Sequence, residues 1–478
     1  MRLPLIVAGR RVEETSGPDV ELRGRTGSRM AIPALDGPTV DAILAAPRDG
    51  LADVPLHDIV AFLNNVGHNW RSKEYSRRRL YVRYLCRQFG YSEKMAETEA
   101  NWISLFLSSH YRLFDMLSVE LGSWHMVDGW YPREEAFVRA LPRGRALHLA
   151  PGNVPLSSVA SLVRALITKN VSVFKVSSDD PMTPLALAMS FLDTDASHPV
   201  TKSLSVVHWR GGQEGPEALR LLHDSDVVCA WGGTDVITWA MRNAPPETEV
   251  LKFGPRRSVA VIGRDADRTK AARALAHDVA MYDQRACFSV QHVYVEQPIV
   301  ESFVNDAEAA FRHYEGLLPK GVHDFDERAG WSLAHLQALF RGDDVRVDDD
   351  RTWSVVVAAQ HPYEEHPLGR TLFVHPVASV AEVAQHLGPD VQTVAVYPGE
   401  VGYALRDACA RKGVARVVEL GLNNVFRVGG THDGMYPLQR LVRFASMEMP
   451  ASIPVKGIVV PIDQTTFLEQ DRFVEFIP

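Results

Sequence analysis

Cys287 is the residue best placed for covalent chemistry. It follows an expected helix over 268–281 and precedes an expected strand over 290–296, so its thiol would lie at the end of an element and not in the middle of the core. A lone cysteine often serves only as a small buried hydrophobic group. The polar stretch over 283–285 favours a catalytic role, because a neighbouring cation such as Arg285 promotes the thiolate, which is the nucleophilic form.

Two further residues whose side chains could bind or stabilise a ligand, Asn153 and Lys175, lie where expected strands end. Gly152 and Asn153 form a turn before an expected helix, where the Asn153 amide would donate a hydrogen bond to a developing oxyanion, helped by the helix dipole. The alternative is an ordinary turn, in which these residue types are common. Lys175 ends an apolar strand, a position that favours an anion or ribose ligand over a lysine that merely extends to solvent from the sheet edge.

Three other motifs carry weaker signals. A glycine turn over 231–235 follows another expected strand, where the backbone could approach a pyrophosphate, although no G-x-G-x-x-G fingerprint occurs. The histidines over 361–376 have a spacing that matches no familiar metal site, so no metal is expected. The basic residues over 71–87 are interpreted as a solvated helix face; the alternative is a surface for an acidic carrier protein or for the phosphates of coenzyme A.

Composition narrows the class of protein. The chain has 478 residues, of which 46% are hydrophobic and 23% charged, enough for about two to four domains. A net charge of −8 provides no electrostatic footprint for nucleic acid. The four cysteines form no C-x-x-C pair, which argues against a disulfide framework or a thiolate zinc site. Because no stretch of about 18 apolar residues and no signal peptide occurs, we expect a cytoplasmic protein without a membrane span.

The elements that must position these residues alternate along the chain. Strand-like pieces over 1–50 suit an edge hairpin or arm, and helical spacing of apolar residues over about 55–127 indicates a helical layer. Apolar strands then alternate with helices, first over about 146–262 and again over about 290–420, which predicts two α/β lobes on parallel sheets. The last stretch is expected to hold a helix over 438–447 and then one further strand.

Taken in order, these motifs resemble the aldehyde dehydrogenase superfamily, and within it the LuxC type of acyl-CoA reductases. PGNVP is similar to the P-W-N-F-P turn, which makes Asn153 the oxyanion-hole asparagine, and DQRACFS is similar to the nucleophile segment, which makes Cys287 the nucleophile. KVSS resembles K-P-S-E, AWGG resembles F-T-G-S, and EEHPLG resembles E-E-I-F-G-P. These three matches imply a set of cofactor-binding residues: Lys175, Ser177, Ser178, Gly232, Gly233, Thr234 and Glu365.

Departures from the superfamily pattern are informative. Lys252 stands where hydrolytic aldehyde dehydrogenases have the glutamate that activates water, and a lysine is a poor general base at neutral pH, so hydrolysis of an acyl-enzyme is disfavoured. Arg285 and Ala286 replace the glycine-glutamine pair before the nucleophile, which matches the reductase branch better. Ser178 replaces a glutamate that usually bridges the adenine ribose hydroxyls, so NADPH is expected in preference to NADH.

The resemblance implies an aldehyde dehydrogenase-like α/β fold in four parts. These are an N-terminal arm and helical layer (1–135), a Rossmann-type dinucleotide-binding domain (136–262), an α/β catalytic domain (263–445) and a C-terminal return and oligomerisation segment (446–478). The C-terminal segment implies a homo-oligomer.

The implied activity is the NADPH-dependent reduction of an acyl thioester to an aldehyde through a thioacyl intermediate on Cys287. The acyl donor would be acyl-CoA or an acyl carrier protein. Two alternatives are an aldehyde dehydrogenase that oxidises an aldehyde and a catalytically silent dinucleotide-binding scaffold subunit. Lys252 argues against the first, and the presence of both Cys287 and Asn153 argues against the second.

Overall fold

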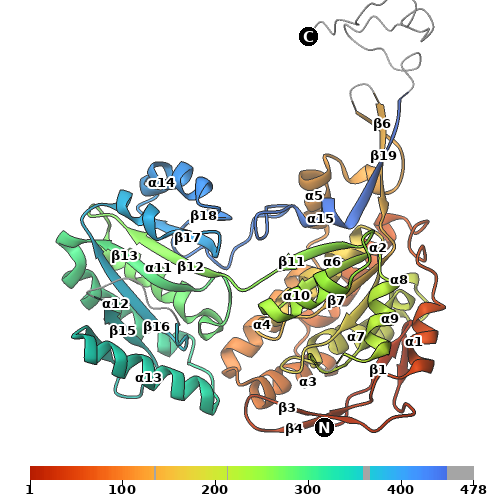
Figure 1. Ribbon diagram of the computed structural model, residues 1–478, viewed down its shortest axis with the longest axis horizontal. Helices are drawn as coiled ribbons and strands as arrows, with labels where there is room; N and C mark the ends of the chain where they lie inside the picture. The colour runs from red at the N-terminus through yellow and green to blue at the C-terminus, as the bar shows by residue number, and fades with distance from the viewer. Residues whose placement is uncertain (134–135, 213, 359–365, 449–478) are drawn as a thin grey trace, which may run out of the picture.

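The structure is a computed structural model that describes residues 1–133, 136–212, 214–358 and 366–448. Its described part contains two seven-stranded sheets, a three-stranded sheet and the two-stranded hairpin of β3 (Val20–Arg23) and β4 (Arg29–Ile32). Figure 1 shows one lobe around each large sheet. The chain crosses between the lobes twice, after β11 (Glu249–Phe253) and before α15 (Pro437–Leu441).

The first large sheet has the strand order β11, β10, β7, β8, β9, β1, β2. Strands β7 to β11 run parallel, and the hairpin β1–β2 adds antiparallel to β9. From β7 the chain moves one way to β8 and β9 and then returns to the other side for β10, so the direction reverses between β7 and β10. The remaining bounds are β1 (Leu5–Val7), β2 (Arg10–Val12), β7 (Arg145–Leu149), β8 (Val171–Lys175), β9 (Leu204–Val207) and β10 (Val227–Trp231).

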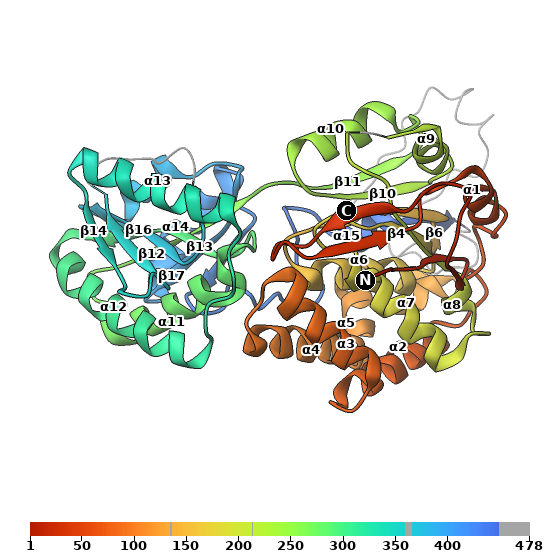
Figure 2. The ribbon, with the colours of Figure 1, turned by 90° about the horizontal axis from the view of Figure 1, so that it is seen from below.

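Helices cover both faces of the first sheet (Figure 2). One face packs against α6 (Pro155–Ile167), α7 (Met182–Asp195) and a helical layer of α2 (Leu56–Arg71), α3 (Ser76–Tyr84), α4 (Glu93–Leu107) and α5 (His110–Leu121). The other face packs against α1 (Gly37–Leu44), α9 (Pro216–His223) and α10 (Thr234–Asn243). Short helical segments are η1 (Leu85–Phe89), η2 (Trp124–Val127) and α8 (Pro199–Lys202).

The basic stretch over 71–87 departs from the expected solvated face. Arg78 is fully buried, and its Nη2 lies 2.5 Å from Oε2 of Glu97. Arg77 pairs with Asp193 of α7 at 2.8 Å. Part of this positive charge therefore joins α3 to its neighbours, because a guanidinium without a carboxylate partner would be costly to bury.

The second large sheet has the order β14, β15, β16, β13, β12, β17, β18, and all neighbours run parallel except β14 and β15. Its bounds are β12 (Arg257–Ile262), β13 (Val290–Glu296), β14 (Asp344–Val347), β15 (Ser354–Val357), β16 (Thr371–Val377), β17 (Val391–Tyr397) and β18 (Arg416–Glu419). The helices are α11 (Arg268–Ala280) and α12 (Val300–Leu317) on one face and α13 (Phe325–Arg341) and α14 (Glu400–Arg411) on the other, with short segments η3 (Met281–Gln284), η4 (Gln297–Ile299) and η5 (Val380–His386).

A small antiparallel sheet of β5 (Tyr131–Arg133), β6 (Ala136–Pro142) and β19 (Val442–Met447) projects from the first lobe (Figure 1). The expected helix over 438–447 is therefore wrong in its second half, because β19 pairs along its whole length with β6. The strand expected after it, and most of the segment 446–478, lie outside the described residues.

Strand β12 belongs to the second sheet, where it pairs with β13 and β17. The division expected from sequence places this strand with the dinucleotide-binding part, since its apolar run directly follows the first α/β series. Sheet pairing is a long-range property that an apolar run does not reveal. Among the described helices, none is both long and apolar enough to cross a membrane.

Candidate active site

A cavity of about 530 Å³ lies between the two lobes. The turns after β7 and β10, the end of β8 and the turn that carries Cys287 all contribute to its wall. Of the nine residues predicted to be catalytic or cofactor-binding, it brings together six: Asn153, Lys175, Ser177, Gly232, Gly233 and Cys287. Ser178 and Thr234 do not line it, and Glu365 lies outside the described residues.

The first lobe supplies a crevice at the carboxyl ends of its parallel strands. The turn that holds Asn153 follows β7, and the glycine turn follows β10, so the two turns flank the point where the direction of the sheet reverses. In open parallel sheets this crevice is where nucleotides bind. The helices α6 and α10 begin at these two turns, and their N-termini add free backbone N–H groups and partial positive charge.

Lys175 marks the end of this crevice at β8. Burial lowers the pKa of its ammonium group, while the charges of Glu214 and Asp179 act against that shift. Ser178 places its hydroxyl 3.3 Å from Nε2 of His208, and burial lowers the pKa of that imidazole to about 3, so the histidine is neutral. Lys175 is thus a partly desolvated cation beside two carboxylates.

The glycine turn after β10 leaves room for a ligand. Gly232 has a φ of 142°, which side chains rarely adopt, and nothing lies within 4 Å of the position that a Cβ would take at Gly233. Thr234 is the exposed first residue of α10. The backbone conformation at Gly232 disfavours any side chain there, and Gly233 has open space beside it. A ligand can therefore approach the backbone of this turn closely.

Cys287 follows a turn whose backbone is strained. Tyr282, Asp283 and Gln284 have φ values of 56°, 49° and 66°, a region that costs non-glycine residues free energy unless the surroundings fix it. Each of the three side chains bonds a different buried group: Tyr282 to Glu99 (2.7 Å), Asp283 to Arg370 (2.7 Å) and Gln284 to the Thr371 backbone (2.6 and 2.8 Å). These bonds hold the turn and so place Cys287 at the cavity wall.

The cation expected to activate Cys287 points elsewhere. Arg285 is buried and pairs with Glu327, with Nε–Oε1 and Nη2–Oε2 distances of 2.9 Å. Burial, followed by the charge of Asp433, raises the pKa of the Cys287 thiol to about 12. The expectation that Arg285 promotes the thiolate is therefore wrong, and the thiol is protonated at neutral pH.

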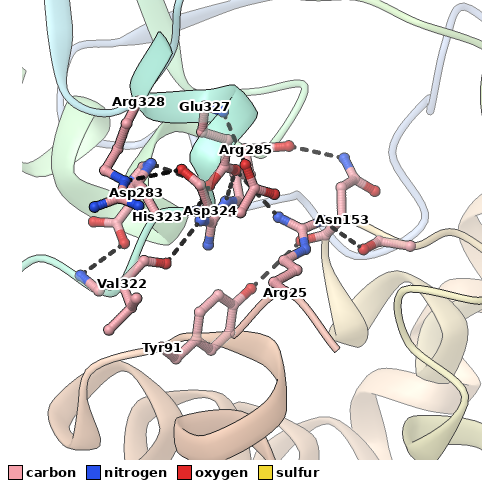
Figure 3. Close-up of polar contacts among 12 residues, drawn as sticks. Arg25, Tyr91, Asn153, Asp283, Arg285, Val322, His323, Asp324, Glu327 and Arg328 are labelled. Carbon is pink, nitrogen blue, oxygen red and sulfur yellow. Dashed lines mark hydrogen bonds and ion pairs between the residues drawn. The ribbon is translucent and has the colours of Figure 1, made fainter. Parts of the chain in front are cut away.

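A ring of polar contacts joins the two turns that carry Asn153 and Cys287 (Figure 3). The Asn153 side-chain amide donates to the Arg285 carbonyl oxygen at 2.8 Å. The Arg285 guanidinium binds Glu327 at the start of α13, and Glu327 Oε1 lies 3.5 Å from Nη1 of Arg25. Arg25, in the β3–β4 turn, closes the ring by donating to the carbonyl oxygen of Gly152 at 2.9 Å. The N-terminal hairpin is thus part of the site.

Lys252 does not face the cavity. It is exposed on β11, whereas its neighbours Phe253 and Gly254 line the cavity wall. The position at which the resemblance implies the general base of hydrolytic aldehyde dehydrogenases is therefore directed away from the cavity.

A second, mainly apolar cavity of about 190 Å³ adjoins the first. It runs between α4, α5 and α6 and is lined by side chains such as Phe106, Leu113 and Met116. The two cavities share six wall residues: Val154, Ser157, Trp231, Phe288, Phe426 and His432. Phe288, which directly follows Cys287, is one of these shared residues, so the second cavity, termed the apolar tunnel, lies next to the segment that carries the thiol.

Comparison with protein families shows which family this chain belongs to. The family model described as acyl-CoA reductase (LuxC) matches residues 51–444. The chain belongs to the LuxC family of acyl-CoA reductases. It is 45% identical over 424 residues to a long-chain acyl-protein thioester reductase of Aliivibrio fischeri, covering 88% of both chains. It is 40% identical over 478 residues to that of Photobacterium phosphoreum, covering 100% of this chain and 97% of the other. This chain is accordingly an oxidoreductase that acts on acyl thioesters.

Solved structures confirm the expected aldehyde dehydrogenase-like fold of this LuxC family member. NADP-dependent glyceraldehyde-3-phosphate dehydrogenase from Bacillus halodurans, in complex with NADP, matches with a TM-score of 0.72 and 17% identity over 94% of this chain and 99% of the other. Lactaldehyde dehydrogenase from Escherichia coli matches with a TM-score of 0.73 and 16% identity over 94% and 99%.

Sequence reasoning did not identify Arg25, Glu327 or Asp433 as residues of the cavity region. Arg25 and Glu327 are far from Cys287 in sequence, and nothing in their local patterns marks a contact across lobes. The Asp-Gly dipeptide at 433–434 does carry a signal, because it favours a tight turn that presents the aspartate.

We expect Glu327→Gln to lower the free energy of unfolding by about 3–5 kcal/mol, because it leaves the buried Arg285 guanidinium without its carboxylate. Loosening of the ring should also lower kcat for thioester reduction more than it raises KM. The ion pairs hold the pKa of Glu327 well below its usual range, so the wild-type protein loses this stabilisation only as the pH falls through the acid range.

Urea denaturation against pH provides the measurement, and Asp326→Asn at the exposed neighbouring position of α13 is the matched control. A loss below about 1 kcal/mol, equal to that of an exposed ion pair, would contradict a structural role for the ring.

Proposed function

We propose that this LuxC family member reduces a long-chain acyl thioester to an aldehyde with NADPH, through a thioacyl intermediate on Cys287. The observation that carries this proposal is the position of Cys287 in the wall of the crevice, next to Phe288, which also lines the apolar tunnel. An acyl chain in the tunnel and a cofactor in the crevice would approach the same sulfur atom from two sides.

The covalent steps follow from the chain's own residues. Cys287 Sγ attacks the thioester carbonyl carbon, the carbonyl oxygen becomes an oxyanion, and the donor thiol departs. The Asn153 amide has two N–H donors, of which one binds the Arg285 carbonyl, so the other is free to stabilise the oxyanion together with the Cys287 backbone N–H. The ring around Glu327 keeps these groups in place during the attack.

The crevice fits a dinucleotide cofactor. The open glycine turn at 232–233 gives a pyrophosphate access to backbone, and Lys175 is a suitable partner for ribose hydroxyls. NADPH in this crevice supplies the hydride that reduces the thioacyl group. Position 178 itself carries no carboxylate that would repel a 2′-phosphate, and the structurally similar dehydrogenase from Bacillus halodurans is in complex with NADP. Glu365, implied by the resemblance as a nicotinamide-ribose ligand, lies outside the described residues.

The tunnel supports a long acyl chain as the transferred group. Its wall is formed largely by aromatic and aliphatic side chains, and the relatives of 40% to 45% identity are named for long-chain acyl-proteins. The acyl donor is therefore a long-chain thioester of a protein thiol or of coenzyme A. Position 252 supplies no base for hydrolysis of the intermediate, since Lys252 is directed away from the cavity.

We also propose that the protein forms a homo-oligomer through the projecting β5–β6–β19 sheet. Phe444 of β19 is 49% exposed, and Met447 is also exposed. Large apolar side chains on a projecting sheet favour contact with another copy.

Ala160→Trp tests the substrate assignment, because Ala160 of α6 lines the tunnel and not the crevice. A bulky side chain there should exclude several methylenes of a long acyl chain, and at about 0.8 kcal/mol per methylene the loss of four amounts to about 3 kcal/mol. We expect kcat/KM for tetradecanoyl-CoA to fall roughly 100-fold, with little change for butanoyl-CoA. Equal losses for both substrates would mean that the tunnel does not hold the chain.

Ser178→Glu tests the cofactor assignment. A carboxylate there should repel the 2′-phosphate and shift the preference from NADPH toward NADH by about 1–2 kcal/mol, roughly 5- to 30-fold in the ratio of kcat/KM values. Ser178→Gln, of similar size but uncharged, is the control. An unchanged ratio would place cofactor discrimination at another residue, such as Arg210.

A further inference from the structure

Asp433 lies at the tip of a tight turn that reaches the catalytic cavity. The backbone N–H of His432 donates to the carbonyl of Met435 at 2.8 Å, and the reverse bond measures 3.0 Å. Asp433 and Gly434 between them have φ values of 50° and 79°, the conformation of a type I′ turn, which Asp-Gly favours. This turn inserts a carboxylate into a cavity wall that is otherwise largely aromatic near Phe426 and His432.

The Asp433 carboxylate is buried and has three neighbours on one oxygen. Its side chain is 3% exposed, and Gln392 Nε2 donates to its Oδ1 at 3.0 Å. Arg256 Nε lies 3.4 Å and His432 Nδ1 3.6 Å from the same oxygen. Among the described residues, the hydrogen bonds and ion pairs to this carboxylate fall on Oδ1, which leaves Oδ2 for a partner in the cavity.

Cys287 and Asp433 act on one another. Both line the cavity, and the charge of Asp433 is the largest single charge that raises the pKa of the Cys287 thiol. The side chain of Gln392, in β17, bonds Asp433 and also interacts with the thiol, where it partly offsets that rise. Cys287 and Asp433 thus share the wall of one cavity, and Gln392 orients the Asp433 carboxylate there.

Other groups near Cys287 are poorer proton acceptors. Among the described residues that line the cavity, the other carboxylates are Asp179 and Glu214, and both act on Lys175 at the crevice end. Burial and the charges of Arg164, Arg416 and Arg256 hold the pKa of His432 well below its usual range, so its imidazole binds a proton weakly.

We propose that Asp433 is the general base that takes the proton of the Cys287 thiol during acylation. This proposal rests on the proposed function and names a catalytic residue for it. As the Cys287 Sγ–carbon bond forms, the thiol proton moves to Asp433 Oδ2. As the bond from that carbon to the donor sulfur breaks, Asp433 gives the proton to the departing donor thiolate. The carboxylate is thereby restored, and no oxidant or reductant takes part in this step.

The surroundings adjust the basicity of Asp433. Burial raises its pKa to about 6, and the charges of Arg256 and Arg164 together with the Gln392 hydrogen bond oppose that rise. The carboxylate is therefore ionised at neutral pH and becomes protonated below about pH 6. A general base must be ionised, so acylation should slow as the pH falls through that value.

Asp433→Asn separates a role as general base from a merely electrostatic effect, because the two roles predict opposite changes in the rate of acylation of Cys287. Loss of the negative charge lowers the pKa of the thiol, so alkylation of Cys287 by iodoacetamide should accelerate about threefold or more. Loss of the base should slow acylation by tetradecanoyl-CoA without cofactor by about 10²-fold or more. Acylation is followed by intact mass after rapid quenching from pH 5 to 9, and Asp407→Asn, exposed on α14, is the control.

Acylation of Asp433→Asn at the wild-type rate or faster would overturn the assignment. Because a variant can misfold, the wild-type pH profile gives an independent test: a rate that does not fall near pH 6 would also overturn it. If the wild type forms no acyl adduct at any pH, the proposed function fails together with this inference, whereas an adduct that forms without Asp433 leaves the proposed function intact.

Discussion

The Cys287 thiol and the Asn153 amide line one cavity but come from different lobes, so the site depends on the contacts that hold the two turns together. The hydrogen bond from Asn153 to the Arg285 carbonyl joins the turns directly, and the path through Glu327 and Arg25 closes the ring on the other side. Because the Arg285 guanidinium is nearly buried, its carboxylate partner is an electrostatic requirement. The crevice, the tunnel and the thiol share one space only while this ring is intact.

Burial of the Cys287 side chain also determines the chemistry of its thiol. A sulfhydryl with a pKa of about 12 is almost fully protonated at neutral pH, so Cys287 is a poor nucleophile until a proton acceptor is engaged during the attack. This differs from sites in which a fixed cation maintains a thiolate. The only cation adjacent in sequence, Arg285, is occupied by Glu327 in forming the ring. Arg285 thus helps to position Cys287, whereas a different side chain must accept the proton of its thiol.

Much of the fold follows from the sequence because parallel α/β lobes have strong local patterns. Buried strands such as β7, β8 and β10 are short apolar runs, and the residues that end them meet at one sheet edge, where the structure brings Asn153, Lys175 and the glycine turn together. Segment 442–447 was mistaken for helix, since its polar and apolar residues suit either period and only its pairing with β6 decides. Contacts between Arg25 and Glu327 have no local signature, because they depend on how two lobes pack.

The central claim is that the acyl group passes onto Cys287 at the junction of tunnel and crevice. The most direct test is to incubate the protein with tetradecanoyl-CoA in the absence of cofactor, digest it at acid pH to preserve thioesters, and locate the added mass by peptide sequencing. The account predicts one tetradecanoyl group, on the peptide that contains Cys287, which disappears as aldehyde when NADPH is added before digestion. An acyl group on any other residue, or aldehyde formation with no acylated Cys287 at any time, would contradict it.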